Sequence, residues 1–268
     1  MGYVAIVAAR FRSLLQYRAA AIGGLFTQTF FGLVRIMILE AFYMATTVVA
    51  PMTLEQSIGY VWLGQATLLL LPWRTDEDVA EQVRTGTIAY ELARPLDLYG
   101  LWFARSLAWR TAPVFLRMFP MFLVAMVIVP LVAPGWELAP PSVASFVSWV
   151  ACFVGAVLLS ASLSALMSVT LLWTIAGDGL PMLVATAATM FGGLVIPLPL
   201  YPDWITPVLY ALPFAGMLDL PSRVFTGNIA PHDAIFVVAH QLLWTGVLVA
   251  LGRWLLSRGV RRIVVQGG

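Results

Sequence analysis

Apolar runs long enough to cross a lipid bilayer recur along the chain, and no other feature limits the possible folds as strongly. A hydrocarbon core about 30 Å thick requires roughly 20 residues of helix. Only 10% of the 268 residues are charged, whereas soluble domains carry about 25% charged residues. The alternating segments of a membrane β-barrel are absent. The sequence therefore predicts an all-α, polytopic membrane protein that forms one transmembrane domain over residues 1–268.

Six runs have the length and the apolar character of membrane-spanning helices. We expect these spans at residues 20–49, 57–73, 112–132, 143–174, 180–198 and 235–256. Residues 1–18 place apolar side chains on one helical face with arginines off that face, which is typical of an amphipathic helix in the lipid headgroup plane; a solvated tail is the alternative. Residues 199–231 are apolar but repeatedly broken by proline, so this segment can only dip into the membrane.

Four polar residues inside these expected spans are candidates for the translocation pathway or for contacts within the helix bundle. They are Arg35, Glu40, Gln65 and His240. An arginine near the middle of the membrane costs roughly 2.5–3.5 kcal/mol, so it should face protein or water. Arg35 and Glu40 lie about 140° apart around a helix. We therefore expect each of these two residues to have a partner elsewhere or a position near the membrane surface.

The fourth expected span contains a regular series of serines. Ser160, Ser164 and Ser168 recur at four-residue steps. Small residues at this spacing allow another helix to approach closely. The series predicts a helix-packing face, and a polar translocation track is the alternative.

The longest charge-dense segment, residues 74–95, lies between the second and third expected spans and reads RTDEDVAEQVRTGTIAYELARP. Thr75 and Asp78 fit a capping box at the start of a short helix. Gly86 fits a break at its C-terminal end, and Pro95 ends a second short helix. We expect this polar segment to be the docking site of a separate, energy-supplying protein; a solvated loop is the alternative.

All fifteen basic residues of the chain are arginines. A Walker A loop needs a lysine to reach the phosphates of a nucleotide, and a retinal or pyridoxal Schiff base needs one as well. An ordinary P-loop and these two chemistries are therefore excluded. We expect no catalytic residue, no metal site and no cofactor in this chain, and we expect ATP and magnesium, if they are used, to bind a partner.

The arginines are distributed unevenly over a six-span topology. Arg35 lies within the bilayer and Arg223 on one side, while all the others fall on the opposite side together with both chain ends. Because short cytoplasmic segments are enriched in Lys and Arg, this pattern places both ends and the segment 74–95 in the cytoplasm.

The sequence VRTGTIAYELARPL at residues 83–96 resembles the coupling region of type 2 ABC transporter permeases, in which a cytoplasmic helix is followed by Gly-Thr-(Ile/Leu) and then Leu-x-x-Pro. The matching residues are Gly86, Thr87, Ile88, Leu92 and Pro95. The same family often enters its re-entrant hairpin through a Gly…Pro…Pro-x-Trp pattern. The matching residues here are Gly193, Pro197, Pro202 and Trp204.

The resemblance implies an amphipathic helix before the first span, six spans, a cytoplasmic coupling helix and a re-entrant hairpin between spans five and six. It also implies a permease subunit of an ABC exporter in the bacterial inner membrane. Two ATPase subunits and a second permease, identical or related, would complete a twelve-helix pore in contact with membrane lipid. The ATPase contact would then fall to Val79, Glu81, Val83, Arg84, Gly86, Thr87, Glu91 and Arg94.

The cargo that this resemblance favours is a hydrophobic small molecule, a drug or a lipid-like compound, and no nucleic acid is involved. Two alternatives come from other classes of protein. An ion-coupled secondary transporter would need intramembrane acids, for which Glu40 and His240 are the inner candidates. A membrane enzyme could hold magnesium through the acidic residues 76–78, but such chemistry usually needs a second acidic cluster, which the sequence lacks.

Overall fold

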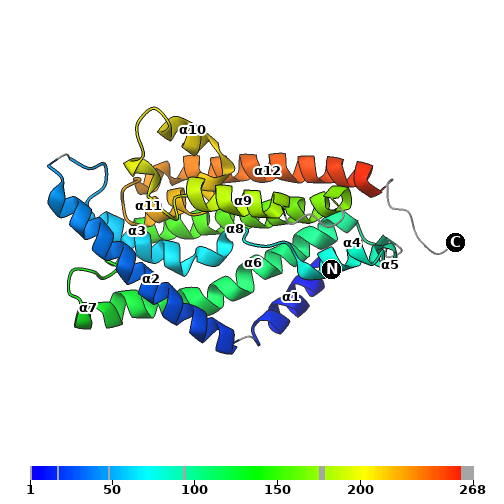
Figure 1. Ribbon diagram of the computed structural model, residues 1–268, viewed down its shortest axis with the longest axis horizontal. Coiled ribbons are helices and arrows are strands. Elements are labelled where there is room, and N and C mark those ends of the chain that lie inside the picture. Colours follow the sequence, from blue (N-terminus) through cyan, green and yellow to red (C-terminus); the bar gives the residue numbers. More distant parts are fainter. Residues whose placement is uncertain (1, 17, 48, 93–94, 175–178, 261–268) are drawn as a thin grey trace.

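The computed structural model describes residues 2–16, 18–47, 49–92, 95–174 and 179–260, and within these ranges the chain forms helices and loops without a β-strand. Long helices run roughly along one common axis (Figure 1). Four of the described helical segments are long and apolar enough to cross a membrane, namely Ala21–Ala45, Leu98–Val132, Val143–Thr174 and Pro231–Gly259. The prediction of an all-helical, multi-pass membrane protein is confirmed.

Three of the expected spans appear as single helices. They are α2 (Arg18–Ala45), α8 (Val143–Thr174) and α12 (Ala234–Gly259). The bounds of α8 are those expected from the sequence, and α2 ends earlier than expected, at Ala45. Since α8 packs against α12, α6 and the re-entrant segment, its many buried side chains form the centre of the bundle.

The helix that contains the third expected span begins well before residue 112. It starts as α6 (Leu98–Leu123) and continues through a π-helical turn (Val124–Ile128) into α7 (Val129–Val132). Its N-cap is Asp97, whose carboxylate accepts a hydrogen bond from the Gly100 N–H. The sequence estimate was too short because Arg105 and Arg110 were assigned to the preceding polar segment, although both lie inside this helix.

The π-helical turn has an identifiable cause. The Val129 N–H donates to the Val124 carbonyl five residues back and so does not reach the Ala125 carbonyl. The next donor in this π-helical pattern would be residue 130, but Pro130 has no N–H, so the carbonyl of Ala125 has no partner within the helix. The backbone N–H of Leu138, in the loop that follows, donates to that carbonyl over 3.0 Å. The loop therefore replaces the hydrogen bond that proline removes.

The second and fifth expected spans, 57–73 and 180–198, are not continuous helices. Helix α3 covers Leu54–Ala66 and gives way to a single 3₁₀ turn, whereas α9 covers Gly179–Phe191 and ends in a turn. A helix of 13 residues is about 20 Å long, which is shorter than the hydrocarbon core. Six crossings of the membrane therefore remain a prediction, and two of them would have to include non-helical backbone.

The break after α3 is stabilised by side chains from two neighbouring helices. Pro72 cannot donate to the carbonyl of Leu68, which favours the end of the helix. Arg110 of α6, only 3% exposed, instead donates to three backbone carbonyls, those of Leu69, Leu71 and Arg74. Ser160 of α8 donates to the carbonyl of Leu70. Non-helical backbone at membrane depth is tolerated only when its polar groups are satisfied in this way.

The break after α9 has an equivalent set of polar partners. Gly193 adopts φ +84°, a conformation that favours glycine. The hydroxyl of Tyr60 lies 2.9 Å from the Gly193 carbonyl oxygen and 2.8 Å from Oδ1 of Asp219. The same carboxylate oxygen accepts the N–H of Leu198, and Arg35 donates to the carbonyl of Val195. Asp219 is fully buried and connects this turn to the re-entrant segment.

The re-entrant segment, residues 199–231, contains only short helices, as its prolines predict. They are α10 (Thr206–Ala211), a 3₁₀ turn (Pro213–Gly216) and α11 (Asp219–Phe225). Gln241 of α12 is fully buried and donates to the carbonyls of Gly216 and Cys152. Helices α7, α10 and α11 lie toward one end of the molecule (Figure 1).

The opposite end carries α1 (Gly2–Leu14), α4 (Glu77–Arg84) and α5 (Ile88–Leu92), beside the last turns of α12 (Figure 1). Helix α1 is shorter than the expected 1–18 and packs along α6. Arg10 does not face lipid headgroups as expected, because its guanidinium forms an ion pair with Asp78 over 2.6 Å.

Replacing Arg110 with methionine tests the role of this arginine in holding the broken backbone. Arg110→Met removes the donors to three carbonyls, and each buried group left without a partner costs about 1–3 kcal/mol. We expect the free energy of unfolding in detergent to fall by about 3 kcal/mol or more. The control is Arg84→Met, since that side chain is exposed and pairs only with Glu81 among the described residues. Equal stability of the two variants would contradict this role.

Candidate functional site

The polar segment between α3 and α6 forms two short helices joined by a glycine turn. Helix α4 ends at Arg84 and α5 begins at Ile88, with Gly86 between them at φ +73°. The residue that caps α4 is Asp76, whose side chain accepts a hydrogen bond from the Asp78 N–H. The capping role expected for Thr75 is therefore wrong by one position. We call residues 76–92 the coupling unit.

The coupling unit is bound to α6 by a cluster of ion pairs around Arg105. This guanidinium contacts Oε1 of Glu91 at 3.0 Å, Oδ2 of Asp78 at 3.0 Å and Oδ2 of Asp76 at 3.2 Å. The side chains of Arg105, Asp76 and Glu91 are largely buried. Arg10 of α1 approaches Asp76 and Asp78 from the other side. One arginine on α6 thereby connects both short helices of the coupling unit, and a second arginine adds α1.

Apolar contacts under the ion pairs fix the coupling unit in place. Val79 of α4 and Ile88 of α5 are each 1% exposed and pack into a cluster with residues of α6 and α8. Trp102 in this cluster donates from its indole Nε1 to Oε2 of Glu91 over 3.0 Å. Ion pairs and apolar contacts thus act on the same two short helices, and both kinds of contact attach the coupling unit to α6.

The outer surface of the coupling unit carries only some of the residues expected to contact an ATPase. The exposed residues of that set are Glu81, Arg84, Gly86 and Thr87. Glu81 and Arg84 form the ion pair that their three-residue spacing predicts, with a distance of 2.7 Å between the charged atoms. Val83 is half-buried. Arg94 lies outside the described residues.

Two residues of that expected set are corrected by their burial. Val79 faces the apolar cluster and Glu91 faces Arg105 and Trp102, so neither side chain is available to a partner. Their apolar and acidic character predicted contact with another protein, but both contacts are made within this chain. Tyr90 of α5, by contrast, is 75% exposed on the outer surface and was not among the expected contacts.

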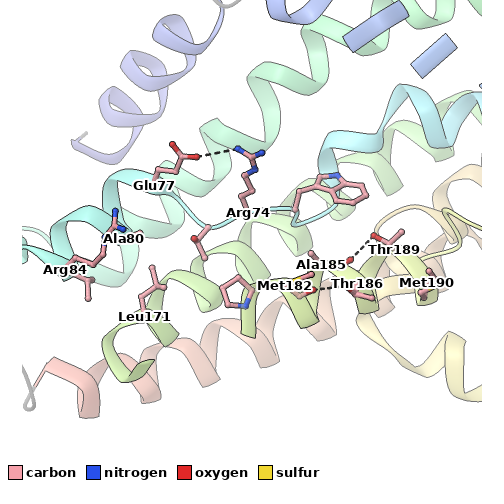
Figure 2. Close-up of a pocket in the computed structure, with 14 residues that line it drawn as sticks. Arg74, Glu77, Ala80, Arg84, Leu171, Met182, Ala185, Thr186, Thr189 and Met190 are labelled. Atoms are coloured by element: carbon pink, nitrogen blue, oxygen red, sulfur yellow. Dashed lines mark hydrogen bonds and ion pairs between the residues drawn. The ribbon is translucent and has the colours of Figure 1, made fainter. Parts of the chain in front are cut away.

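A cavity of about 730 Å³ opens between the coupling unit and α9. Figure 2 shows Arg74, Glu77 and Arg84 on one wall and Met182, Thr186 and Thr189 of α9 on the other. Arg74 and Glu77 form an exposed ion pair at 3.6 Å. The cavity lies at the end of the membrane helices that carries the coupling unit, which is called here the coupling end. We call the space the entry cavity.

A second space, of about 560 Å³, lies deeper along the bundle and is called here the membrane groove. Its walls come from α2, from the broken end of α3 and from the turn after α9. The lining residues are Phe31, Arg35, Ile38, Leu39, Gln65, Leu68, Trp73, Leu194, Val195, Ile196 and Pro197. Trp73 also lines the entry cavity, so this side chain belongs to the walls of both spaces.

The structure brings together two of the four polar candidates from the membrane spans. Arg35 and Gln65 line the same groove. Glu40 lies elsewhere and accepts a hydrogen bond from the indole of Trp136 over 3.1 Å. The expectation that Arg35 and Glu40 have different partners is confirmed, since Arg35 donates to a backbone carbonyl near α9. His240 lies on α12 next to the 3₁₀ turn that precedes α11.

The serine series of α8 is buried against neighbouring elements, and its helix-packing role stays a prediction. Ser160, Ser164 and Ser168 are all buried. Ser164 accepts a hydrogen bond from Nε of Arg110 over 2.8 Å and donates to the carbonyl of Ser160. Ser168 donates to the carbonyl of Ser164. Small side chains here let Arg110 and the broken end of α3 approach α8 closely.

The contacts of several residues at this site could not be predicted from a single sequence. Arg105 and Arg110 look like ordinary flanking arginines, because their partners are distant in the sequence. Asp219 could have been found, since it is an isolated acid within an apolar stretch, and such residues seldom lie in a membrane without a function or a partner.

Comparison with known protein families identifies a match over most of the chain. The sequence model of a family described as "ABC-2 family transporter protein" matches residues 29–267, which is most of the chain and includes both the coupling unit and the membrane groove. No curated protein matches the chain significantly.

Replacing Arg105 with glutamine tests whether this residue fixes the coupling unit. Arg105→Gln leaves three carboxylates without their shared cation, so the backbone of α4 should open more often. We expect amide hydrogen exchange across residues 80–84 to accelerate at least tenfold, which corresponds to about 1.4 kcal/mol. Arg253→Gln is the matched control, because it removes an exposed ion pair with Asp97 and a cation–π contact with Tyr99, both outside the coupling unit. Unchanged exchange in Arg105→Gln would contradict this role of Arg105 and would show that the apolar contacts alone hold the coupling unit in place.

Proposed function

Given that the chain belongs to the ABC-2 family of transporter proteins, and is thus a multi-pass permease subunit, we propose that it exports its cargo on energy supplied by separate ATPase subunits. In this proposal the chain contributes half of the translocation pathway and binds no nucleotide. ATP and magnesium act on the ATPase subunits.

The observation that carries this proposal is the attachment of the coupling unit. Its outer surface, formed by Glu81, Arg84, Gly86, Thr87 and Tyr90, is exposed for docking. Its inner surface is bound to α6 through Arg105. A flexible loop would absorb a push from a partner, whereas a unit fixed by buried ion pairs moves as a rigid body.

Helix α6 carries this motion to the pathway. Arg105 and Arg110 lie on the same helix, and Arg110 holds the backbone from Leu69 to Arg74. That backbone contributes Trp73, which lines both the entry cavity and the membrane groove. When ATP closes the ATPase pair, displacement of the coupling unit would shift α6 and with it the segment between the two spaces. Hydrolysis would reset the arrangement.

The exposed apolar surface supports a second permease as partner. Phe30 and Ile38 of α2 and Met182 and Leu183 of α9 are more than half exposed. The groove is lined by α2 and by the turn after α9, and α9 itself lines the entry cavity. A second copy, or a related permease, packed along α2 and α9 would cover both spaces and complete a twelve-helix pore. The apolar lining of the groove suits a hydrophobic, drug-like or lipid-like cargo.

The membrane orientation follows from charge. The coupling end carries nearly all the described arginines, and Arg223 lies at the other end. By the positive-inside rule the coupling end is cytoplasmic. The start of α1 and the end of α12 lie at this end (Figure 1) and would be cytoplasmic as well, in the bacterial inner membrane that the family resemblance implies.

Replacing Gly86 with tryptophan tests the docking surface. Gly86→Trp places a bulky side chain where a Cβ atom would meet nothing within 4 Å, so the permease should insert normally. We expect the amount of ATPase that co-purifies with the tagged chain to fall at least tenfold, together with ATP-driven export.

The matched control is Gly86→Ala, which requires the same left-handed backbone, at about 1–2 kcal/mol, without the bulk. It should recruit the ATPase normally. Normal recruitment by Gly86→Trp would contradict the assignment of the docking surface. Transport by the purified chain under a proton gradient, with no ATPase present, would contradict the proposed energy source and favour an ion-coupled transporter.

A further inference from the structure

The membrane groove is apolar on every wall but contains one charged side chain. Phe31 and Ile38 come from α2, Leu68 from the broken end of α3, and Leu194 and Ile196 from the turn after α9. Among the described lining residues, Arg35 alone carries a charge. The volume of about 560 Å³ falls within the range of small-molecule sites, about 300–1,000 Å³.

Most of the hydrogen-bonding capacity of Arg35 is unused. A guanidinium has five N–H donors, and in the described part of the chain that of Arg35 makes one hydrogen bond, to the Val195 carbonyl over 3.2 Å. No described acid pairs with it. Asp219 is engaged by Tyr60, Leu198 and Arg223. A bidentate anion is the partner that a guanidinium geometry fits best.

The groove also lies beside the entry cavity. Trp73 lines both spaces, and the two arginines of the entry cavity, Arg74 and Arg84, are each paired with an acid, Glu77 and Glu81 respectively. The groove itself lies where two interrupted helices meet, which is the place where many transporters bind their substrates.

We infer that the membrane groove binds an anionic amphiphile, a carboxylate or phosphate ester on a hydrocarbon body, as cargo arriving from the coupling end, and that Arg35 selects it. The acidic group accepts hydrogen bonds from those N–H groups of Arg35 that do not bind the Val195 carbonyl. The hydrocarbon body lies against Phe31, Ile38 and Leu194. This inference rests on the proposed export function and narrows its cargo to one charge class.

Competitive photolabelling of the full chain tests the inference. The purified permease is placed in phosphatidylcholine nanodiscs without ATPase and labelled with a photoactivatable dodecyl phosphate. Unlabelled dodecyl phosphate and dodecanoate should compete at least tenfold better than dodecanol or dodecyltrimethylammonium, which have the same chain length. The labelled peptides should contain residues of the groove.

Two variants of Arg35 separate charge from structure. Arg35→Gln keeps an N–H donor for the Val195 carbonyl but removes the charge, so labelling by the anionic probe should fall at least tenfold while labelling by a photoactivatable dodecanol stays unchanged. Arg35→Lys keeps the charge and should retain most anionic labelling. Arg117→Gln, which removes a membrane arginine outside the groove, should match the unaltered chain.

Three results would overturn the inference: equal competition by anion and alcohol, unchanged labelling of Arg35→Gln, or labelling outside the groove. Loss of labelling when phosphatidylglycerol is added to the nanodiscs would assign the groove to a bilayer lipid and overturn the cargo assignment. Because no ATPase takes part, failure here is distinct from failure of the proposed function, which shows as absent ATP-driven export in the assembled complex.

Discussion

The polar groups of the backbone have no water to bind in the middle of a bilayer, and this constraint governs the whole molecule. Two of the expected spans are interrupted, and each interruption leaves carbonyl and N–H groups that need partners. Arg110 and Ser160 supply them after α3, while Tyr60, Asp219 and Arg35 supply them after α9. The burial of Arg110, Ser160 and Asp219 is therefore explained by the broken helices, and each break is covered by neighbouring elements.

The interruptions also create the spaces in which a cargo could lie. An intact helix presents only side chains to its neighbours, whereas a broken helix leaves room beside the exposed turn. The membrane groove lies between the two breaks, and the entry cavity lies beside one of them. Helix α6 is the element common to both the coupling unit and the break after α3. In the proposed mechanism, the same arginines that stabilise the fold would therefore connect the ATPase docking surface to the translocation pathway.

The sequence alone predicted what depends on local pattern. The bounds of α8 follow from a long apolar run, the turn at Gly86 from the glycine, and the pair between Glu81 and Arg84 from their spacing. What it could not predict depends on contacts between distant segments. Arg105 and Arg110 looked like residues of a polar loop, and Glu91 and Val79 looked like parts of a docking surface, because their partners on α6 and α8 are not visible in a local pattern. The breaks after α3 and α9 were hidden for the same reason.

The continuous helix Leu98–Val132 contains 35 residues and is about 50 Å long, so roughly 20 Å of it projects beyond a 30 Å hydrocarbon layer. Arg105 lies in the early turns of this helix, toward the coupling end, where water and headgroups lower the cost of gathering charges. In the proposed mechanism, this helix and not a flexible tether holds the docking surface away from the lipid. Because the ion pairs of Arg105 attach the outer part of the helix to the coupling unit, it would transmit tension as well as compression, and departure of the ATPase would draw the bundle back.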